Sequence, residues 1–240
     1  MNSNRTDRPP DIPDPLSAIP DPRSAIPMTQ PGIIFDLDGT LVDSFADITA
    51  SFCRSFASAG CAAPDPIDVR PLMGLDLKDM YERFVDAALI DQLIAAYRAD
   101  YAERCADTTR PFPGIVELLD ELGDAGVPRA VATTKTTWMA RTVTDKLGLS
   151  SRLDHVQGTD GFAYKPAPDV VLHAASALGT PVAWMVGDSW LDIEAGKAAG
   201  VRTCAVTWGV SDIDRLRAAH PDAIVESVDA LRGVLAGVSA

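Results

Sequence analysis

Short apolar runs alternate with helical patterns along most of the chain. The runs of strand length cover residues 33–35, 127–132, 153–156, 182–186 and 202–206, with 223–225 as a candidate edge strand. Helical patterns lie between them, at residues 114–124, 138–147, 169–178 and 191–199. Strands that alternate with helices of this length predict an α/β fold, in which helices cover both faces of a parallel sheet.

Residues 44–110 break this alternation. No strand-like run occurs there, and apolar residues such as Ile48, Phe52 and Phe56 follow the spacing of a helix face. Because this all-helical segment follows the first strand directly, we expect it to lie over the ligand crevice as a cap. The predicted organisation is a core of residues 28–43 and 111–240 with a helical cap of residues 44–110.

The first 27 residues are different in kind. They are crowded with proline, and residues 14–20 are nearly repeated in residues 21–27. Such a segment packs poorly, so we expect an extended or disordered tail. Two alternatives are a proline-rich arm that binds a partner and a true translation start at Met28.

Composition and charge narrow the functional classes. A chain of 240 residues, 47% hydrophobic and 23% charged, is typical of a soluble globular protein. Its net charge of −13 disfavours nucleic acid as a partner, because the phosphate backbone would be repelled. The four cysteines lack metal-type spacing, and no stretch reaches the ~18 apolar residues of a membrane span. We expect a cytoplasmic protein, monomeric or homodimeric, with reduced cysteines and no membrane contact.

Two carboxylates follow the first predicted strand. Asp36 and Asp38 come directly after the apolar run, and Gly39 ends it. In an open parallel sheet the ligand crevice lies at the carboxyl ends of the strands, so both side chains are expected to line it. Paired carboxylates at this place suit metal-assisted phosphoryl transfer, although an acidic turn that ends a strand is the simpler alternative.

Three further polar groups follow later strands. Thr133 and Thr134 come after the second strand, Lys165 stands before a proline after the third, and Asp188 and Asp192 follow the fourth. Hydroxyls and free N–H groups at a helix start suit phosphate oxygens, and Asp188 and Asp192 are spaced to share one helix face. Taken singly, each also has a structural interpretation, as a helix N-cap, a solvated loop lysine or an acidic first turn.

Together the four motifs resemble those of the haloacid dehalogenase-like hydrolase superfamily, in particular its phosphoglycolate phosphatase-like branch with a helical cap. The resemblance runs from about Gly32 to the C-terminus. It implies a Rossmann-like three-layer core with an inserted all-helical cap, and a hydrolase of phosphomonoesters. The implied substrate is a small phosphorylated metabolite, with 2-phosphoglycolate as one candidate. Thr134 stands where the family has asparagine, which weakens the match to the phosphoglycolate phosphatases themselves.

The resemblance also implies roles for individual residues. Asp36 would attack phosphorus and form an aspartyl-phosphate, while Asp38 would act as general acid and then as general base. Thr133, Lys165 and backbone N–H groups near Thr134 would bind the phosphoryl oxygens.

A metal ion is part of the implied mechanism. Mg²⁺ would be held by the carboxylates of Asp36 and Asp188 and by the backbone carbonyl of Asp38. Asp192 would orient a metal-bound water or the lysine of the third motif.

Substrate choice is expected to come from the cap. Residues 70–75 match the position of the family's specificity loop, where Gly74 would let backbone approach the ligand. Arg70 would bind a substrate carboxylate, and an exposed salt bridge is an equal alternative.

Other activities share parts of this pattern. Dehalogenation needs no leaving-group acid, so Asp38 argues against it. Phosphonate cleavage in the family uses a cap lysine, and the only lysine in the predicted cap is Lys78. β-Phosphoglucomutase-like phosphotransfer shares all four motifs and stays open. A receiver-like phosphoaccepting signalling module is an alternative of another class, although receivers are shorter and uncapped.

Overall fold

A six-stranded parallel sheet forms the centre of the molecule. The computed structural model describes residues 30–238, so the predicted tail, residues 1–27, lies outside the described residues. The strand order is β5-β4-β1-β6-β7-β8, which confirms the predicted parallel α/β sheet and places the candidate edge strand at an edge. The strands are β1 (Gly32–Phe35), β4 (Arg129–Ala132), β5 (His155–Gln157), β6 (Val182–Gly187), β7 (Arg202–Val206) and β8 (Ala223–Val225).

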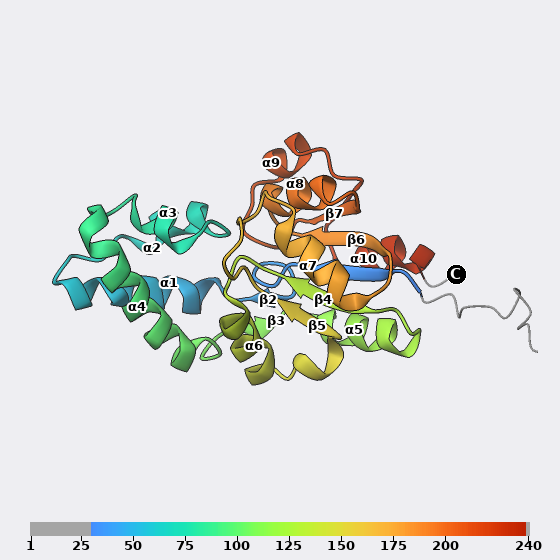
Figure 1. Ribbon diagram of the computed structural model, residues 1–240, viewed down its shortest axis with the longest axis horizontal. Coiled ribbons are helices and arrows are strands. Elements are labelled where there is room, and N and C mark those ends of the chain that lie inside the picture. The colour runs from blue at the N-terminus through green and yellow to red at the C-terminus, as the bar shows by residue number, and fades with distance from the viewer. Residues whose placement is uncertain (1–29, 239–240) are drawn as a thin grey trace, which may run out of the picture.

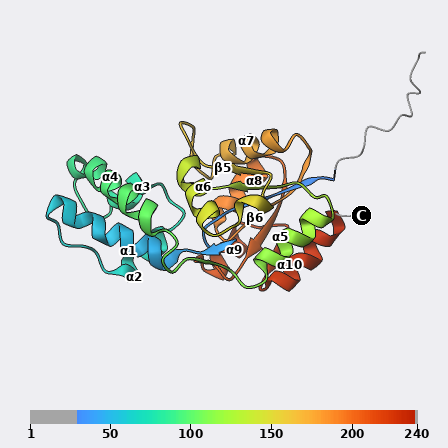
Figure 2. The ribbon, with the colours of Figure 1, turned by 90° about the horizontal axis from the view of Figure 1, so that it is seen from below.

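Helices cover both faces of this sheet. Successive side chains of β1 point to opposite faces, so Ile33 and Phe35 pack in one apolar cluster while Ile34 packs in another. The first cluster includes residues of α5, α6 and α10, and the second includes residues of α7 and α8. Figure 2 shows α5 and α10 on the side of the sheet opposite α7. These helices are α5 (Ile115–Asp124), α6 (Thr137–Lys146), α7 (Asp169–Leu178), α8 (Trp190–Ala198), α9 (Ile213–Ala218) and α10 (Val228–Leu235).

The ends of some elements differ from the sequence-based ranges. Strand β4 begins at Arg129 rather than at residue 127, because Pro128 has no N–H to donate to a neighbouring strand. Strand β5 covers residues 155–157 instead of 153–156, and α8 covers residues 190–198 instead of 191–199. Such shifts leave the carboxyl ends of β1, β4 and β6 where the motifs require them.

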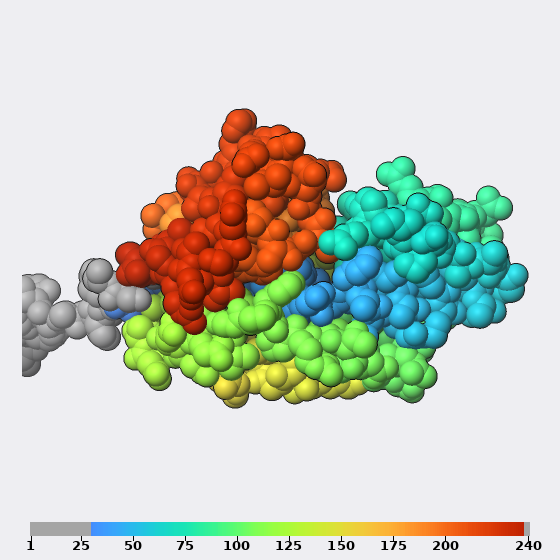
Figure 3. Space-filling view, turned by 180° about the vertical axis from the view of Figure 1, so that it is seen from behind, coloured from blue at the N-terminus to red at the C-terminus, as the bar shows by residue number. Residues whose placement is uncertain are grey.

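A short ribbon connects the sheet to a helical insert, residues 44–110. Strands β2 (Val42–Asp43) and β3 (Arg110–Pro111) pair antiparallel, so the chain leaves and re-enters the core at neighbouring points. Figures 1 and 3 show the insert as a lobe beside the sheet. Its helices are α1 (Phe45–Ser55), α2 (Pro66–Val69), α3 (Leu77–Tyr81) and α4 (Ala87–Arg104). No helix between residues 30 and 238 is long and apolar enough to cross a membrane.

Aromatic side chains hold the insert together. The ring of Phe52 stacks on that of Tyr81 with centroids 4.3 Å apart, and Phe56 packs against both rings. On α4, Tyr97 and Tyr101 stack with centroids 5.3 Å apart. All five side chains are buried, so the insert has its own apolar centre.

Asp47 joins the two connections between the insert and the core. Its carboxylate accepts hydrogen bonds from the N–H groups and hydroxyls of Thr108 and Thr109, at 2.6–3.1 Å. Burial alone would raise the pKa of Asp47, but these bonds outweigh it and lower the pKa. The carboxylate therefore ties the first turn of α1 to the segment that leads into β3.

Candidate functional site

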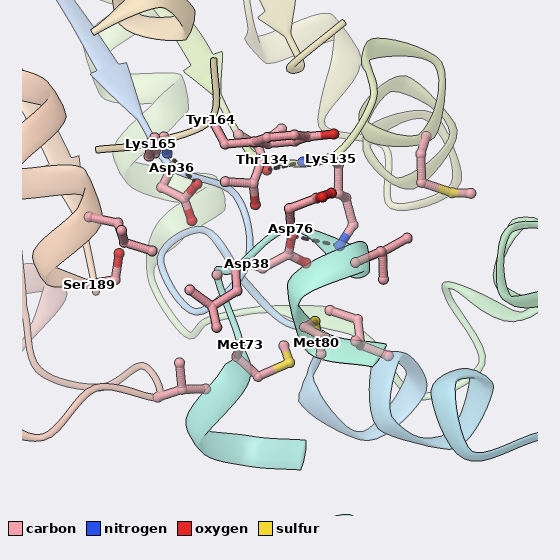
Figure 4. Close-up of a pocket in the computed structure, with 18 of the residues that line it drawn as sticks. Asp36, Asp38, Met73, Asp76, Met80, Thr134, Lys135, Tyr164, Lys165 and Ser189 are labelled. Carbon is pink, nitrogen blue, oxygen red and sulfur yellow. Dashed lines mark hydrogen bonds and ion pairs between the residues drawn. The ribbon is translucent and has the colours of Figure 1, made fainter. Parts of the chain in front are cut away.

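A cavity opens at the carboxyl ends of the strands, between the sheet and the insert. It encloses about 930 Å³, including its opening to solvent. The core contributes the side chains of all four motifs, and the insert contributes residues from α1, the 73–77 segment, α3 and α4. Figure 4 shows Asp36, Asp38, Thr134 and Lys165 around it. The structure thus brings together motif residues that are up to 156 positions apart, from Asp36 to Asp192.

Lys165 lies against Asp36 at the base of the cavity. Its Nζ donates to Asp36 Oδ1 at 2.8 Å, to Asp192 Oδ1 at 2.6 Å and to the carbonyl of Ala132 at 2.6 Å. An ammonium group has three N–H donors, so all are used. Among the described residues no donor contacts Asp36 Oδ2, which leaves one carboxylate oxygen available to a ligand.

Burial has the largest single effect on the pKa values of Asp36 and Lys165. Burial raises the pKa of Asp36 to about 7, with the charges of Asp192 and Asp38 adding to the rise and Lys165 opposing it. Burial also disfavours the charged form of Lys165, but Asp192 and Asp36 outweigh it and raise the lysine's pKa. The site therefore keeps a permanent cation beside a carboxylate that is poorly stabilised without a further positive charge.

Asp188 adds a second buried carboxylate on the neighbouring strand. Burial raises its pKa well above the ordinary value, and the charges of Asp192 and Asp36 raise it further. Carboxylate oxygens of Asp36, Asp188 and Asp192 lie within 4.8 Å of one another. Two glycines make room for Asp188, because a Cβ at Gly39 would lie 2.3 Å from its Oδ2 and one at Gly209 2.1 Å. Asp36 and Asp188 each keep one carboxylate oxygen that accepts no hydrogen bond from the described residues, so this crowded acidic group fits a divalent cation with hard oxygen ligands.

The second aspartate of the first motif has a different environment. Asp38 Oδ1 accepts from the hydroxyl of Ser44 at 2.5 Å, and Oδ2 accepts from Lys135 Nζ at 2.7 Å. The Lys135 ammonium lies 4.9 Å from the ring centroid of Tyr101 on α4. Both oxygens of Asp38 are therefore held, one by Ser44 at the start of the insert and one by a lysine of the core that contacts Tyr101 of the insert.

Neither Thr133 of the second motif nor Asp188 of the fourth is a helix N-cap, because a neighbouring residue takes that position in each case. Thr133 is not the N-cap of α6, because that position belongs to Thr136, whose hydroxyl accepts from the N–H of Met139. At α8 the N-cap is Ser189, and Asp192 completes the capping box by accepting from the Ser189 N–H. Asp192 thus fixes the helix start with one oxygen and Lys165 with the other.

The cap residues divide between two cavities. Gly74 lines the main cavity, as expected. Arg70 does not; its guanidinium lies 5.0 Å from the ring centroid of Phe45, and Arg70 lines a second, neighbouring cavity. Arg98 on α4 is the insert arginine that lines the main cavity. The sequence pattern missed Arg98, because helical spacing alone does not say which side of α4 faces the sheet.

Lys135 was also missed, although it follows Thr134 directly. Nothing in the sequence joins Lys135 to Asp38, which is 97 residues away. Tyr164 was missed in the same way, although it directly precedes Lys165. Tyr164 lines the cavity, and burial, followed by the charge of Asp76 of the insert, raises the pKa of its hydroxyl.

Comparisons with known proteins agree with this geometry. The model of the haloacid dehalogenase-like hydrolase family matches residues 33–206. A phosphoglycolate phosphatase from Agrobacterium fabrum is 35% identical over 206 residues, which are 82% of this chain and 88% of the relative. A pyrophosphatase PpaX from Bacillus velezensis is 34% identical over 197 residues, covering 80% of this chain and 90% of the relative.

A solved structure gives the same result for the fold. The crystal structure of a predicted phosphatase from Clostridium acetobutylicum superposes with a TM-score of 0.78 and 27% identity, covering 87% of this chain and 99% of that chain. The chain belongs to the haloacid dehalogenase-like hydrolases. Its family, its fold and its class as a hydrolase were all predicted from the sequence and are confirmed, and the relatives support a phosphatase function.

Proposed function

We propose that this protein is a Mg²⁺-dependent phosphomonoester hydrolase that acts through an aspartyl-phosphate. The observation that carries the proposal is the buried group of Asp36 and Asp188, at the carboxyl ends of the adjacent strands β1 and β6, with Lys165 against Asp36 and Asp38 at the edge of the group. The cytoplasmic location and the monomeric or homodimeric state expected from the sequence stay predictions.

Asp36 is proposed as the nucleophile. One of its oxygens is fixed by Lys165, and the other faces the cavity, from which it can attack phosphorus in line. Attack forms the aspartyl-phosphate and expels the leaving-group oxygen, and water then hydrolyses that intermediate. Splitting the reaction in this way replaces one difficult step with two easier ones.

Asp38 is proposed as the general acid and base. It would give a proton to the departing oxygen and then take one from the attacking water. Thr133 and the N–H of Thr134 would contact the transferring phosphoryl oxygens, and the positive charge of Lys165, held 2.8 Å from Asp36 Oδ1, would offset the charge on those oxygens. Asp192 supports this arrangement by fixing Lys165, which it contacts at 2.6 Å.

Mg²⁺ is proposed as the cofactor, held by the carboxylates of Asp36 and Asp188 and by the backbone carbonyl of Asp38. Burial and mutual repulsion raise the pKa of both carboxylates, which is the condition that a bound cation relieves. When bound, the ion would offset negative charge on the phosphoryl group.

The helical insert is proposed as the cap that selects the substrate. Relatives named for phosphoglycolate and for pyrophosphate make both compounds candidates. β-Phosphoglucomutase-like phosphotransfer and the receiver-like function have no observation in their favour beyond the shared motifs.

The test is Mg²⁺-dependent phosphate release from a panel of phosphorylated compounds. The panel would hold 2-phosphoglycolate, pyrophosphate, sugar phosphates, nucleoside monophosphates and p-nitrophenyl phosphate, each with an EDTA control. We expect turnover that EDTA abolishes and that Asp36→Asn lowers at least about 1,000-fold. The matched control is Asp43→Asn, an exposed aspartate after the same loop, which should retain wild-type turnover.

Two results would contradict the proposal. If the folded protein releases phosphate from no compound of the panel, the proposed phosphatase function is wrong. Retention of more than a few per cent of the wild-type rate by Asp36→Asn would remove the nucleophile assignment.

A further inference from the structure

One cation of the main cavity has no contact with the substrate in the reaction proposed above. Lys135 lines the cavity, and its side chain is 11% exposed. Among the described residues, Asp38 is the sole hydrogen-bond acceptor of its ammonium group, at 2.7 Å. The face of Tyr101 occupies another side of the ammonium without accepting a conventional hydrogen bond. Lys135 therefore has N–H donors left for a ligand.

Lys165 offers no such spare donors. Its three contacts, to Asp36, Asp192 and the carbonyl of Ala132, use the whole ammonium group. In Figure 4 Lys165 lies beside Asp36, and a dashed line joins Lys135 to Asp38. The two lysines thus stand beside different aspartates, one at the proposed nucleophile and one at the proposed general acid.

The insert side of the cavity offers few polar partners for a leaving group. Of the described insert residues that line the cavity, Asp76 and Arg98 carry charged side chains, and most of the others are apolar. A sugar leaving group would bury hydroxyls against the apolar side chains of this wall, which is unfavourable. The apolar and aromatic residues that form it are Ile48, Met73, Leu75, Leu77, Met80 and Tyr97.

The position of Lys135 limits how far a second anionic group of the substrate can lie from the leaving-group oxygen. As general acid, Asp38 would lie within hydrogen-bond distance of the leaving-group oxygen, and Lys135 lies 2.7 Å from Asp38. Two hydrogen bonds in series through the Asp38 carboxylate place the ammonium within about 6–8 Å of that oxygen. An anion that contacts Lys135 must then be attached close to the bridging oxygen.

We propose that Lys135 is a substrate-binding residue that selects phosphorylated compounds with a second anionic group one or two atoms from the bridging oxygen. The inference rests on the proposed phosphatase function and narrows its substrate class. A carboxylate on the neighbouring carbon, as in 2-phosphoglycolate, meets this condition, and so does the second phosphoryl group of pyrophosphate. Neutral alkyl phosphates and hexose phosphates do not.

The test compares 2-phosphoglycolate with ethyl phosphate, in which a methyl group replaces the carboxylate. Values of kcat and KM would be measured for both, and for pyrophosphate, in the wild-type protein and in Lys135→Met, Lys135→Gln and Lys135→Arg. Lys135→Gln keeps a hydrogen-bond donor for Asp38 but removes the charge. The matched control is Lys78→Met, because Lys78 is an exposed lysine of the insert whose side chain is 63% exposed.

The wild-type protein should prefer 2-phosphoglycolate to ethyl phosphate. Lys135→Met and Lys135→Gln should lower kcat/KM for 2-phosphoglycolate about tenfold or more, mainly through KM, and that for ethyl phosphate less than about threefold. Lys135→Arg should retain part of the preference, and Lys78→Met all of it. If kcat/KM falls for pyrophosphate and not for 2-phosphoglycolate, the second anion that Lys135 binds is a phosphoryl group.

Equal losses for charged and neutral substrates would overturn the inference, because Lys135 would then act only on Asp38. Melting temperatures of each variant separate this result from misfolding, and Lys135→Arg supplies the comparison if the neutral variants do not fold. Hydrolysis of p-nitrophenyl phosphate without preference for 2-phosphoglycolate or pyrophosphate would contradict the inference alone. Absence of hydrolysis of every ester would contradict the proposed function as well.

Discussion

Asp36 and Asp38 are two positions apart in the chain, yet their carboxylates have different surroundings. Asp36 is held on one oxygen by a buried lysine and leaves the other open, whereas Asp38 is held on both oxygens by Ser44 and Lys135. A nucleophile needs an open oxygen, and a proton donor needs to be held in position. The difference in contacts supports different roles for the two aspartates.

The role of Asp38 predicts that its loss depends on the leaving group. In Asp38→Asn, hydrolysis of alkyl phosphates should fall about 100-fold or more, while p-nitrophenyl phosphate should fall far less, because a good leaving group needs little protonation. Steady-state kinetics on both esters measure the ratio. Similar losses on the two esters would count against the acid role.

The site was predictable from the sequence where strand ends set the position of a residue. Asp36, Thr133, Lys165 and Asp188 each follow a strand of one parallel sheet, so their meeting follows from topology. The contacts of Lys135 did not follow, because they depend on side-chain directions in two elements that are distant in sequence.

At the scale of elements, the connection between the core and the insert is a ribbon of two very short strands. Strands β2 and β3 are two residues each, too short to give an alternating pattern, so the sequence predicted none there. Helices α5 to α8 and the buried strands were predicted individually, whereas the insert was predicted only as helical and α9 and α10 were not predicted. The ribbon is instead fixed by tertiary contacts, among them the hydrogen bonds to Asp47.

Removing the charge of Asp47 should destabilise this connection. In Asp47→Asn the amide would direct its own N–H groups at the donors of Thr108 and Thr109, at a cost of about 1–3 kcal/mol in the free energy of unfolding. Denaturant titration at pH 7 measures the difference from the wild-type protein. Asp107→Asn, on a side chain that is 57% exposed, is the matched control and should change stability little.

The same variant has a defined pH dependence. Because the folded protein lowers the pKa of Asp47, the carboxylate stabilises the fold at pH values above the unfolded pKa, and this stabilisation is lost as the pH falls through the folded pKa. The difference in the free energy of unfolding between the wild-type protein and Asp47→Asn should therefore be largest at neutral pH and should disappear below about pH 4. A gap that stays constant into acid would show that the charge of Asp47 has no part in it.

For the molecule as a whole, the buried acids make stability depend on a cation. Asp36, Asp188 and Asp192 repel one another in a chain whose net charge is already −13. A cation that binds only the folded protein stabilises it by mass action. Saturating Mg²⁺ should raise Tm by about 5 °C or more relative to EDTA.

Asp188→Asn tests where that cation binds. The variant should lose most of the Mg²⁺-dependent rise in Tm, because one of the two proposed carboxylate ligands is gone. Asp214→Asn, on a side chain that is 86% exposed, should keep the full rise. Scanning fluorimetry across a Mg²⁺ titration measures both, and an undiminished rise in Asp188→Asn would place the metal elsewhere.

The β2–β3 ribbon also bears on how such a protein can change over generations. Since the chain leaves and returns at neighbouring residues, the helical insert is topologically one long surface loop. Recombination at the ribbon could exchange that segment as a cassette without altering the strand order or the residues at the strand ends. Substrate range and chemical machinery can then evolve on separate stretches of the gene.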